Sequence, residues 1–97
     1  HGDIGTVDRN PDQSLAANNK ANKPKYWERQ PYSFGDCTKH AVGDDFGSVW
    51  DLGVGYSALI LKSDGVNDVW VDPMEGLYGT ASAKDISHVI VCVDQQP

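Results

Sequence analysis

The last apolar stretch of the chain reads Asp85-Ile86-Ser87-His88-Val89-Ile90-Val91-Cys92-Val93. β-Branched residues dominate it, and such side chains favour the pleated, half-buried surface of a β-strand. Strand alternation places Ile86, His88, Ile90 and Cys92 on one face, and Ser87, Val89, Val91 and Val93 on the other. Because both faces are largely apolar, we predict a strand in the interior of a sheet rather than at its edge.

Shorter strand patterns precede this stretch, with turn residues between them. The predicted strands cover residues 37–42, 46–52, 56–62 and 69–71. Asp64-Gly65 predicts a hairpin turn, Gly43-Asp44-Asp45 a second turn, and residues 74–83 a loop rich in small side chains. Short strands at this spacing are typical of an antiparallel sandwich or small barrel. We therefore predict an all-β fold, a small antiparallel β-sandwich over residues 31–97.

Residues 1–30 are polar and predict an irregular N-terminal arm. Asp12 is a candidate N-cap of one short helix that would have almost no apolar face, and residues 21–25 are typical of an extended linker. A polar segment of this length does not order itself by burying its own surface. If it is ordered, we expect the flank of the domain, a bound ion or another copy of the chain to hold it.

The chain has two cysteines, Cys37 and Cys92, which lie far apart in the sequence. In a cytosolic protein they would be separate buried thiols, whereas in an exported protein they would form a bridge worth about 4 kcal/mol on the chain-entropy model. The sequence contains no Cys-x-x-Cys pair, so the cysteines do not predict a zinc site. We predict the disulfide, joining the first strand of the core to the last.

Charge and hydropathy exclude some partners and favour a compartment. The net charge of −6 argues against nucleic acid and against an anionic membrane surface. No apolar run approaches the ~20 residues that a membrane helix needs. The chain opens on His1 without a Met. Either a signal peptide was removed before His1 or His1 is the end of an expression tag. We expect the first, and that the protein is secreted, extracellular or at the cell surface.

The strand sequences resemble a family of poorly characterised exported domains found in bacterial and archaeal surface proteins. The residues that carry the resemblance lie in Val49–Leu52, Tyr56–Gly65, Asp68–Pro73, Gly76–Leu77 and Ile86–Cys92. They include the Ser87-His88-x-x-x-Cys92 ending. Trp70 lies where the family has an aromatic residue, and Lys62 lies in the strand that carries a lysine in the family. The chain departs from the family at Val93, where an aromatic residue is expected. The resemblance spans about residues 46–93 and implies an extracellular β-sandwich. It implies no catalytic residue.

Aromatic residues cluster where the arm meets the domain. Tyr26, Trp27, Tyr32 and Phe34 are punctuated by Pro31. Such a cluster either packs on the core or forms a ligand platform. For the platform we name Tyr26, Trp27 and Tyr32, whose rings could stack on sugars, whereas Trp50 and Trp70 lie within strand patterns and are expected in the core.

Metal and catalytic chemistry have weaker candidates. An N-terminal His1 chelates copper through its amine and imidazole, and His40 or His88 would complete a histidine brace. His88 is also expected as a core histidine. Loop aspartates such as Asp64 and Asp68 could bind calcium or simply face solvent. Ser87 and His88 are adjacent in one strand and point to opposite faces, so they do not form a nucleophile–base pair. We predict no cofactor and no enzyme activity.

These observations favour a secreted module that acts by surface contact. The first hypothesis is a structural or assembly subunit at the cell surface, whose arm contacts a neighbouring copy. The alternative is a carbohydrate-binding module that uses Tyr26, Trp27 and Tyr32. A second alternative is a copper-binding protein. The expected partners are copies of the chain or a cell-surface polymer.

Overall fold

The computed structural model describes residues 6–41 and 47–94. The predicted turn at Gly43-Asp44-Asp45 and the predicted copper ligand His1 lie outside these residues. Within them the elements follow the order β1 (Val7–Asp8), β2 (Gln13–Ala16), η1 (Lys20–Asn22), α1 (Pro24–Glu28), β3 (Asp36–Ala41), β4 (Val49–Leu52), β5 (Ala58–Ser63), β6 (Val66–Val71), β7 (Gly76–Gly79) and β8 (Ile86–Val93).

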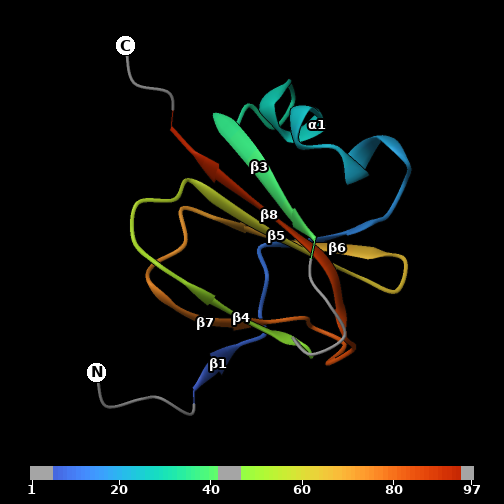
Figure 1. Ribbon diagram of the computed structural model, residues 1–97, viewed down its shortest axis with the longest axis vertical. Coiled ribbons are helices and arrows are strands. Elements are labelled where there is room, and N and C mark those ends of the chain that lie inside the picture. The colour runs from blue at the N-terminus through green and yellow to red at the C-terminus, as the bar shows by residue number, and fades with distance from the viewer. Residues whose placement is uncertain (1–5, 42–46, 95–97) are drawn as a thin grey trace.

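The described strands form two sheets (Figure 1). The larger, here the main sheet, has the order β2-β6-β5-β8-β3, and each neighbouring pair is antiparallel. The smaller has the order β1-β7-β4, with β1 parallel to β7. β8 lies between β5 and β3, which confirms the predicted interior strand. The predicted all-β sandwich with a disulfide is also confirmed.

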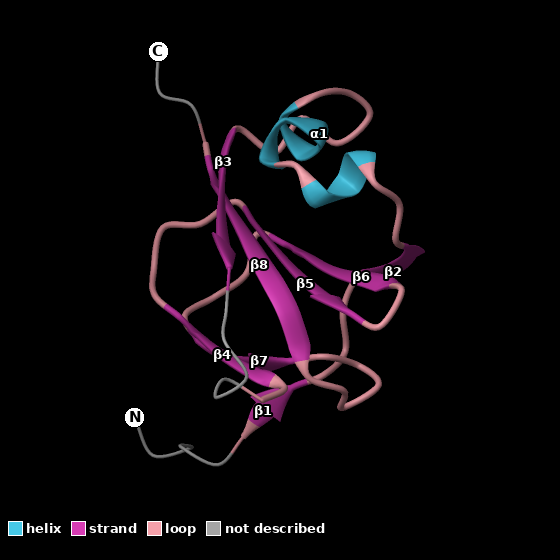
Figure 2. Cartoon of the chain, turned by 45° about the vertical axis from the view of Figure 1, so that its right-hand side comes forward, coloured by secondary structure: helices cyan, strands magenta, loops and turns pink. Residues whose placement is uncertain are grey.

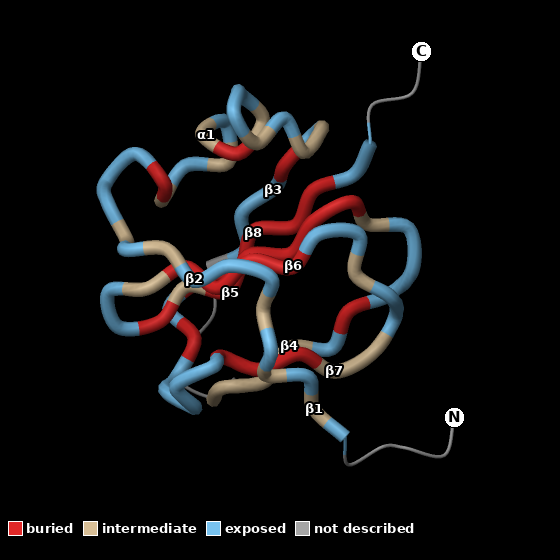
Figure 3. The backbone as a smooth tube through the Cα atoms, turned by 180° about the vertical axis from the view of Figure 1, so that it is seen from behind, coloured by how far each residue is buried: buried red, intermediate tan, exposed pale blue. Residues whose placement is uncertain are grey.

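Each face of the main sheet is covered by a different part of the chain. The small sheet packs on one face, and the segment that holds η1 and α1 packs on the other (Figure 2). Side chains of β5, β6 and β8 alternate between two clusters. Figure 3 shows that these strands are buried along most of their length. Ile60, Val69 and Ile90 face the helical segment, whereas Leu59, Leu61 and Val89 face the small sheet.

One β-bulge changes the predicted faces of β8. Lys62 pairs with His88, but the next residue of β5, Ser63, pairs with Ile86, so Ser87 is an extra residue in β8. Ile86 therefore joins Val89 in the cluster under the small sheet. The prediction that Ile86 shares a face with Ile90 and Cys92 is wrong because the bulge interrupts the alternation.

The predicted disulfide is present. Cys37 and Cys92 are direct partners in the β3–β8 pair, with Cα atoms 4.0 Å apart. The bridge joins strands separated by 55 positions in sequence and lies in the cluster under the helical segment. It therefore ties the outermost strand of the main sheet to its interior.

The arm is part of the sandwich. Residues 13–16 form β2, an outer strand of the main sheet, and not the predicted helix. Asp12 is not an N-cap, since its carboxylate accepts a hydrogen bond from the Val71 N–H at 2.7 Å. Ser14 donates to the buried carboxylate of Asp68 at 2.6 Å. Backbone pairing thus orders a segment whose side chains bury little, and residues before and after position 30 share one core.

Two other local predictions are wrong. Residues 21–25, expected as an extended linker, lie in η1 and α1 except for Lys23, which is extended between them as the residue before a proline should be. Pro24 at the first helical position has the φ that a helix needs. Residues 74–83, expected as a loop, contain β7. Its sequence Gly76-Leu-Tyr-Gly79 has weak strand preference, but β7 pairs with both β1 and β4.

Candidate functional site

The helical segment is capped at its start by a local hydrogen bond and joined to the main sheet at its end. Asn18 begins it, since the Oδ1 atom accepts the Ala21 N–H at 2.9 Å. The Glu28 carboxylate closes it by accepting the N–H of Cys37 in β3 at 2.9 Å. The Glu28 bond holds the short helix against β3, whereas an isolated helix of this length would not be stable.

Trp27 is the anchor of this segment and not a ligand platform. Its side chain is 0% exposed, and Nε1–H donates to the Ala21 carbonyl at 3.0 Å. Its ring contacts those of Tyr26, Tyr32 and Phe34 at centroid distances of 5.0, 4.8 and 6.2 Å. The prediction that Trp27 stacks on a ligand is therefore wrong, because the indole ring is buried among other side chains and its Nε1–H is bonded to a backbone carbonyl.

The other two platform residues remain at the surface and lie together. Tyr26 and Tyr32 are half-buried, with ring centroids 5.6 Å apart and planes inclined by 40°. Both line a groove of about 550 Å³ beside α1, which we call the basic groove. Its lining consists of Asn19, Lys20, Lys23, Lys25, Tyr26, Arg29, Gln30, Pro31 and Tyr32.

The basic groove concentrates positive charge in an acidic protein. Lys20, Lys23, Lys25 and Arg29 make up half of the eight basic residues in a chain of net charge −6. No acidic residue lines the groove, and the ion pair found among residues 6–41 and 47–94 lies elsewhere, between Lys84 and Asp64. Burial, then the hydrogen bond to Tyr26, raises the pKa of Tyr32 above its ordinary 10.0, so its phenol stays neutral at physiological pH.

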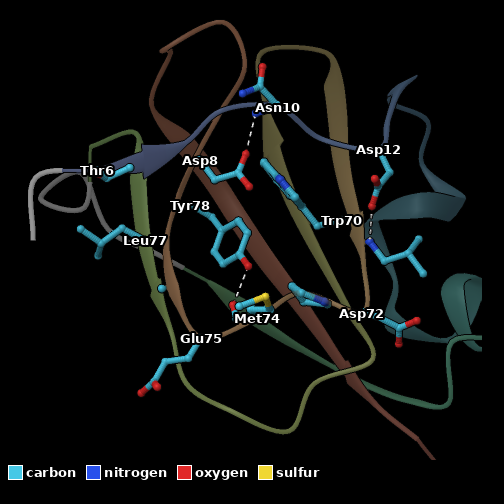
Figure 4. A pocket seen from close by; sticks show the side chains of 13 residues that line it. Thr6, Asp8, Asn10, Asp12, Trp70, Asp72, Met74, Glu75, Leu77 and Tyr78 are labelled. Atoms are coloured by element: carbon cyan, nitrogen blue, oxygen red, sulfur yellow. Dashed lines mark hydrogen bonds between the residues drawn. The ribbon is translucent and has the colours of Figure 1, made fainter. Parts of the chain in front are cut away.

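A second pocket of about 480 Å³ has the opposite charge (Figure 4). It lies between β1, β7 and the segment after β6, and we call it the acidic pocket. Four carboxylates and no basic side chain are among its lining residues Thr6, Asp8, Asn10, Asp12, Trp70, Val71, Asp72, Pro73, Met74, Glu75, Gly76, Leu77 and Tyr78. The carboxylates of Asp8 and Asp12 already accept backbone N–H groups, from Asn10 and Val71.

Two aromatic residues form the wall of the acidic pocket. Trp70 and Tyr78 make an edge-to-face contact with centroids 5.3 Å apart. The Tyr78 hydroxyl donates to the Met74 carbonyl, while burial, and next the negative charge of Asp8, raises the pKa of Tyr78 above 10.0. The Trp70 Nε1–H has no hydrogen-bond partner among the described residues. Trp70 is 4% exposed, which agrees with the core position expected for it.

The structure places His40 and His88, the two described candidates for a copper ligand, on opposite faces of the main sheet. His40 pairs with Val89, faces the small sheet and stacks on Trp50 at 5.9 Å. His88 pairs with Lys62, whose side chain lies on the other face of the main sheet. In the parts of the chain that the structure describes, no group of three or more His, Cys, Asp or Glu side chains is arranged to hold a metal ion.

The basic groove was partly accessible to sequence reasoning. Tyr26 and Tyr32 were named as platform residues, but the four cations around them were assigned to a polar arm with no structure. Residues 20–29 show no apolar periodicity. Only Asn18, a helix-capping residue, and Pro24, at a first helical position, indicate in the sequence that these residues form one folded segment.

Comparisons with protein-family models, with curated proteins and with solved structures find no match to this chain. Among residues 6–41 and 47–94, no helix has the length and apolarity needed to cross a membrane. The resemblance to exported surface domains therefore stays a prediction.

Proposed function

We propose that this protein is a non-catalytic carbohydrate-binding module, secreted into an oxidising compartment, which holds its ligand in the basic groove. The observation that carries the proposal is the pair of half-exposed tyrosines, Tyr26 and Tyr32, fixed side by side on the buried Trp27. Flat aromatic faces with a polar tip match the apolar C–H faces and hydroxyl edges of sugar rings. The disulfide supports the compartment.

The preorganisation of the two rings supports this proposal further. Trp27 packs behind both tyrosines, and Phe34 supports Tyr32 at 5.7 Å. The rings therefore lose little conformational entropy when a ligand binds. Asn19 and Gln30 at the rim add amide groups that both donate and accept hydrogen bonds, as sugar hydroxyls require.

The assembly hypothesis loses the observation that motivated it. It rested on the need for an outside surface to order the arm, and the arm's contacts with β6 and with the Trp27 cluster meet that need within one chain. No described feature now favours an assembly role over ligand binding at the groove.

Retention on a panel of insoluble polysaccharides tests the proposal. We expect the folded protein to be retained by at least one of them, and Tyr26→Leu and Tyr32→Leu to reduce retention about tenfold, because leucine fills space but has no flat face. Tyr56→Leu is the matched control, since Tyr56 is half-buried against the other cluster and lies outside the groove. Thermal unfolding confirms that the variants fold. No retention on any polymer, or equal loss in the control, contradicts the proposal.

A further inference from the structure

We propose that the polysaccharide bound by the basic groove is acidic, with carboxylate or sulfate groups on its sugar rings. This inference rests on the proposed function and specifies its ligand. Its basis is the placement of Lys20, Lys23, Lys25 and Arg29 around Tyr26 and Tyr32. A neutral sugar would need the two rings and a few hydroxyl partners, and it would leave this concentration of charge unused.

The four cations line a groove to which no described residue contributes a carboxylate. None of them takes part in an ion pair among the described residues. The nearest acidic residue in sequence, Glu28, is occupied by the Cys37 N–H. Lys25 lies in α1 and Arg29 directly follows its last residue, and both line the groove with Lys20 and Lys23, so like charges gather there and repel one another. An anionic ligand removes this repulsion, whereas a neutral ligand does not.

The geometry matches an acidic sugar better than a simple anion. A uronate or sulfated ring presents its apolar face to an aromatic ring and its charged group at the ring edge. Here the tyrosine rings lie within the same groove as the ammonium groups and the Arg29 guanidinium, which pairs with carboxylate or sulfate through two parallel hydrogen bonds. Stacking and charge pairing can therefore be made by one sugar residue and its neighbours along the polymer.

The rest of the molecule disfavours a nucleic acid as the polyanion. The positive charge is local, because the chain carries 14 acidic residues against 8 basic ones. The acidic pocket is lined by residues of β1 and β7, and these strands lie across the main sheet from α1 (Figures 1 and 2). Nucleic acid binding normally needs an extended basic surface, whereas four of the eight basic residues here are confined to one groove.

The test uses polymers that share a backbone and differ in charge. Affinity electrophoresis of the intact, oxidised protein is run with polygalacturonate and its fully methyl-esterified form, with dextran sulfate and dextran, and with an oligothymidylate. We expect at least one acidic polymer to bind about tenfold or more tightly than its neutral partner, and the binding to weaken as salt rises. The two pairs distinguish carboxylate from sulfate.

Charge variants localise the effect. Lys23→Gln/Lys25→Gln should weaken binding of the acidic polymer about tenfold, and Lys39→Gln/Lys62→Gln, which removes the same charge outside the groove, should not. Equal binding of the acidic and neutral forms overturns this inference and leaves carbohydrate binding intact. Binding of oligothymidylate alone overturns both proposals, as does failure of every polysaccharide to bind. Equal loss of binding in the two double variants also overturns the inference, because the loss would then reflect the net charge of the protein and not the cations of the groove.

Discussion

Gly35 marks a position where one added methyl group has no room. It connects the aromatic cluster to β3 with φ of +108°, and a Cβ atom built there would lie 2.1 Å from the Val93 carbonyl oxygen. We expect Gly35→Ala to lower the free energy of unfolding by about 2–4 kcal/mol, because both the backbone angle and the backbone contact oppose a side chain. Urea unfolding measures this loss.

Gly65 is the matched control for that substitution. It also has positive φ, +77°, but nothing lies within 4 Å of a Cβ atom built on it. Gly65→Ala should therefore cost only the conformational term, about 1 kcal/mol. Equal losses in the two variants would contradict the steric role of Gly35.

His88 makes stability depend on pH. Burial of the ring, and then the positive charges of Lys39 and Lys62, lowers the pKa of His88 from 6.5 to about 4. The neutral ring is favoured in the folded state, so stability is complete above pH 6.5 and falls as the pH drops from 6.5 to about 4. We expect a loss of about 1–2 kcal/mol, below the ~3 of the whole shift, because solvent screens the lysine charges.

The variant His88→Leu isolates this effect from the titration of carboxylates. Urea unfolding of both proteins at several pH values between 6.5 and 4 gives the difference in slope. The wild-type protein should lose stability faster than His88→Leu in this range, because only it can bind the proton. Parallel curves would rule out a shifted His88.

At the scale of elements, the sequence predicts the strands whose side chains are most deeply buried. β5 and β8 carry continuous apolar residues, and both were predicted with their limits within two residues. β2 and β7 were missed because Gln13-Ser-Leu-Ala16 and Gly76-Leu-Tyr-Gly79 have little strand preference of their own. Their partners in the sheets form them, and such long-range pairing leaves no local signal. For the basic groove, the sequence predicts Tyr26 and Tyr32 but not the cations around them, because their placement also depends on long-range packing.

Removal of residues 1–17 tests whether the arm belongs to the sandwich. The deletion removes β1 and β2 and leaves β6 unpaired along one edge. We expect loss of cooperative unfolding or a fall of several kcal/mol, because Leu15 and the backbone bonds to β6 are lost together. Circular dichroism on heating measures it.

Two point variants in β2 give a graded version of the same experiment. Leu15 packs against the cluster under the helical segment, whereas Gln13 is exposed. Leu15→Ser should cost about 1–2 kcal/mol and Gln13→Ser almost nothing. A truncated protein that melts like the full chain would show that the arm is dispensable and would restore the case for an outside partner.

Two hollows of opposite charge lie on the two sides of the main sheet. The basic groove lies on the side of the helical segment, and the acidic pocket lies beside β1 and β7 (Figures 1 and 4). Net charge alone predicts an acidic surface and argues against nucleic acid and an anionic membrane surface. That prediction averages over the molecule, whereas a ligand meets only one side of it. Local folding of residues 18–34, which composition does not encode, creates the difference.

The disulfide sets the stability of this arrangement, because β3 is an outer strand and supports α1 through the Glu28 carboxylate. Cross-linking residues separated by 55 positions is worth about 4 kcal/mol on the chain-entropy model. We expect Cys37→Ser/Cys92→Ser to lose about that much and to bind acidic polysaccharide less well, since the groove rests on β3. Reductant should lower the wild-type melting temperature to that of the variant and leave the variant unchanged. A variant that still responds to reductant, or a wild type that does not, would mean that the Cys37–Cys92 bridge does not hold the sandwich together.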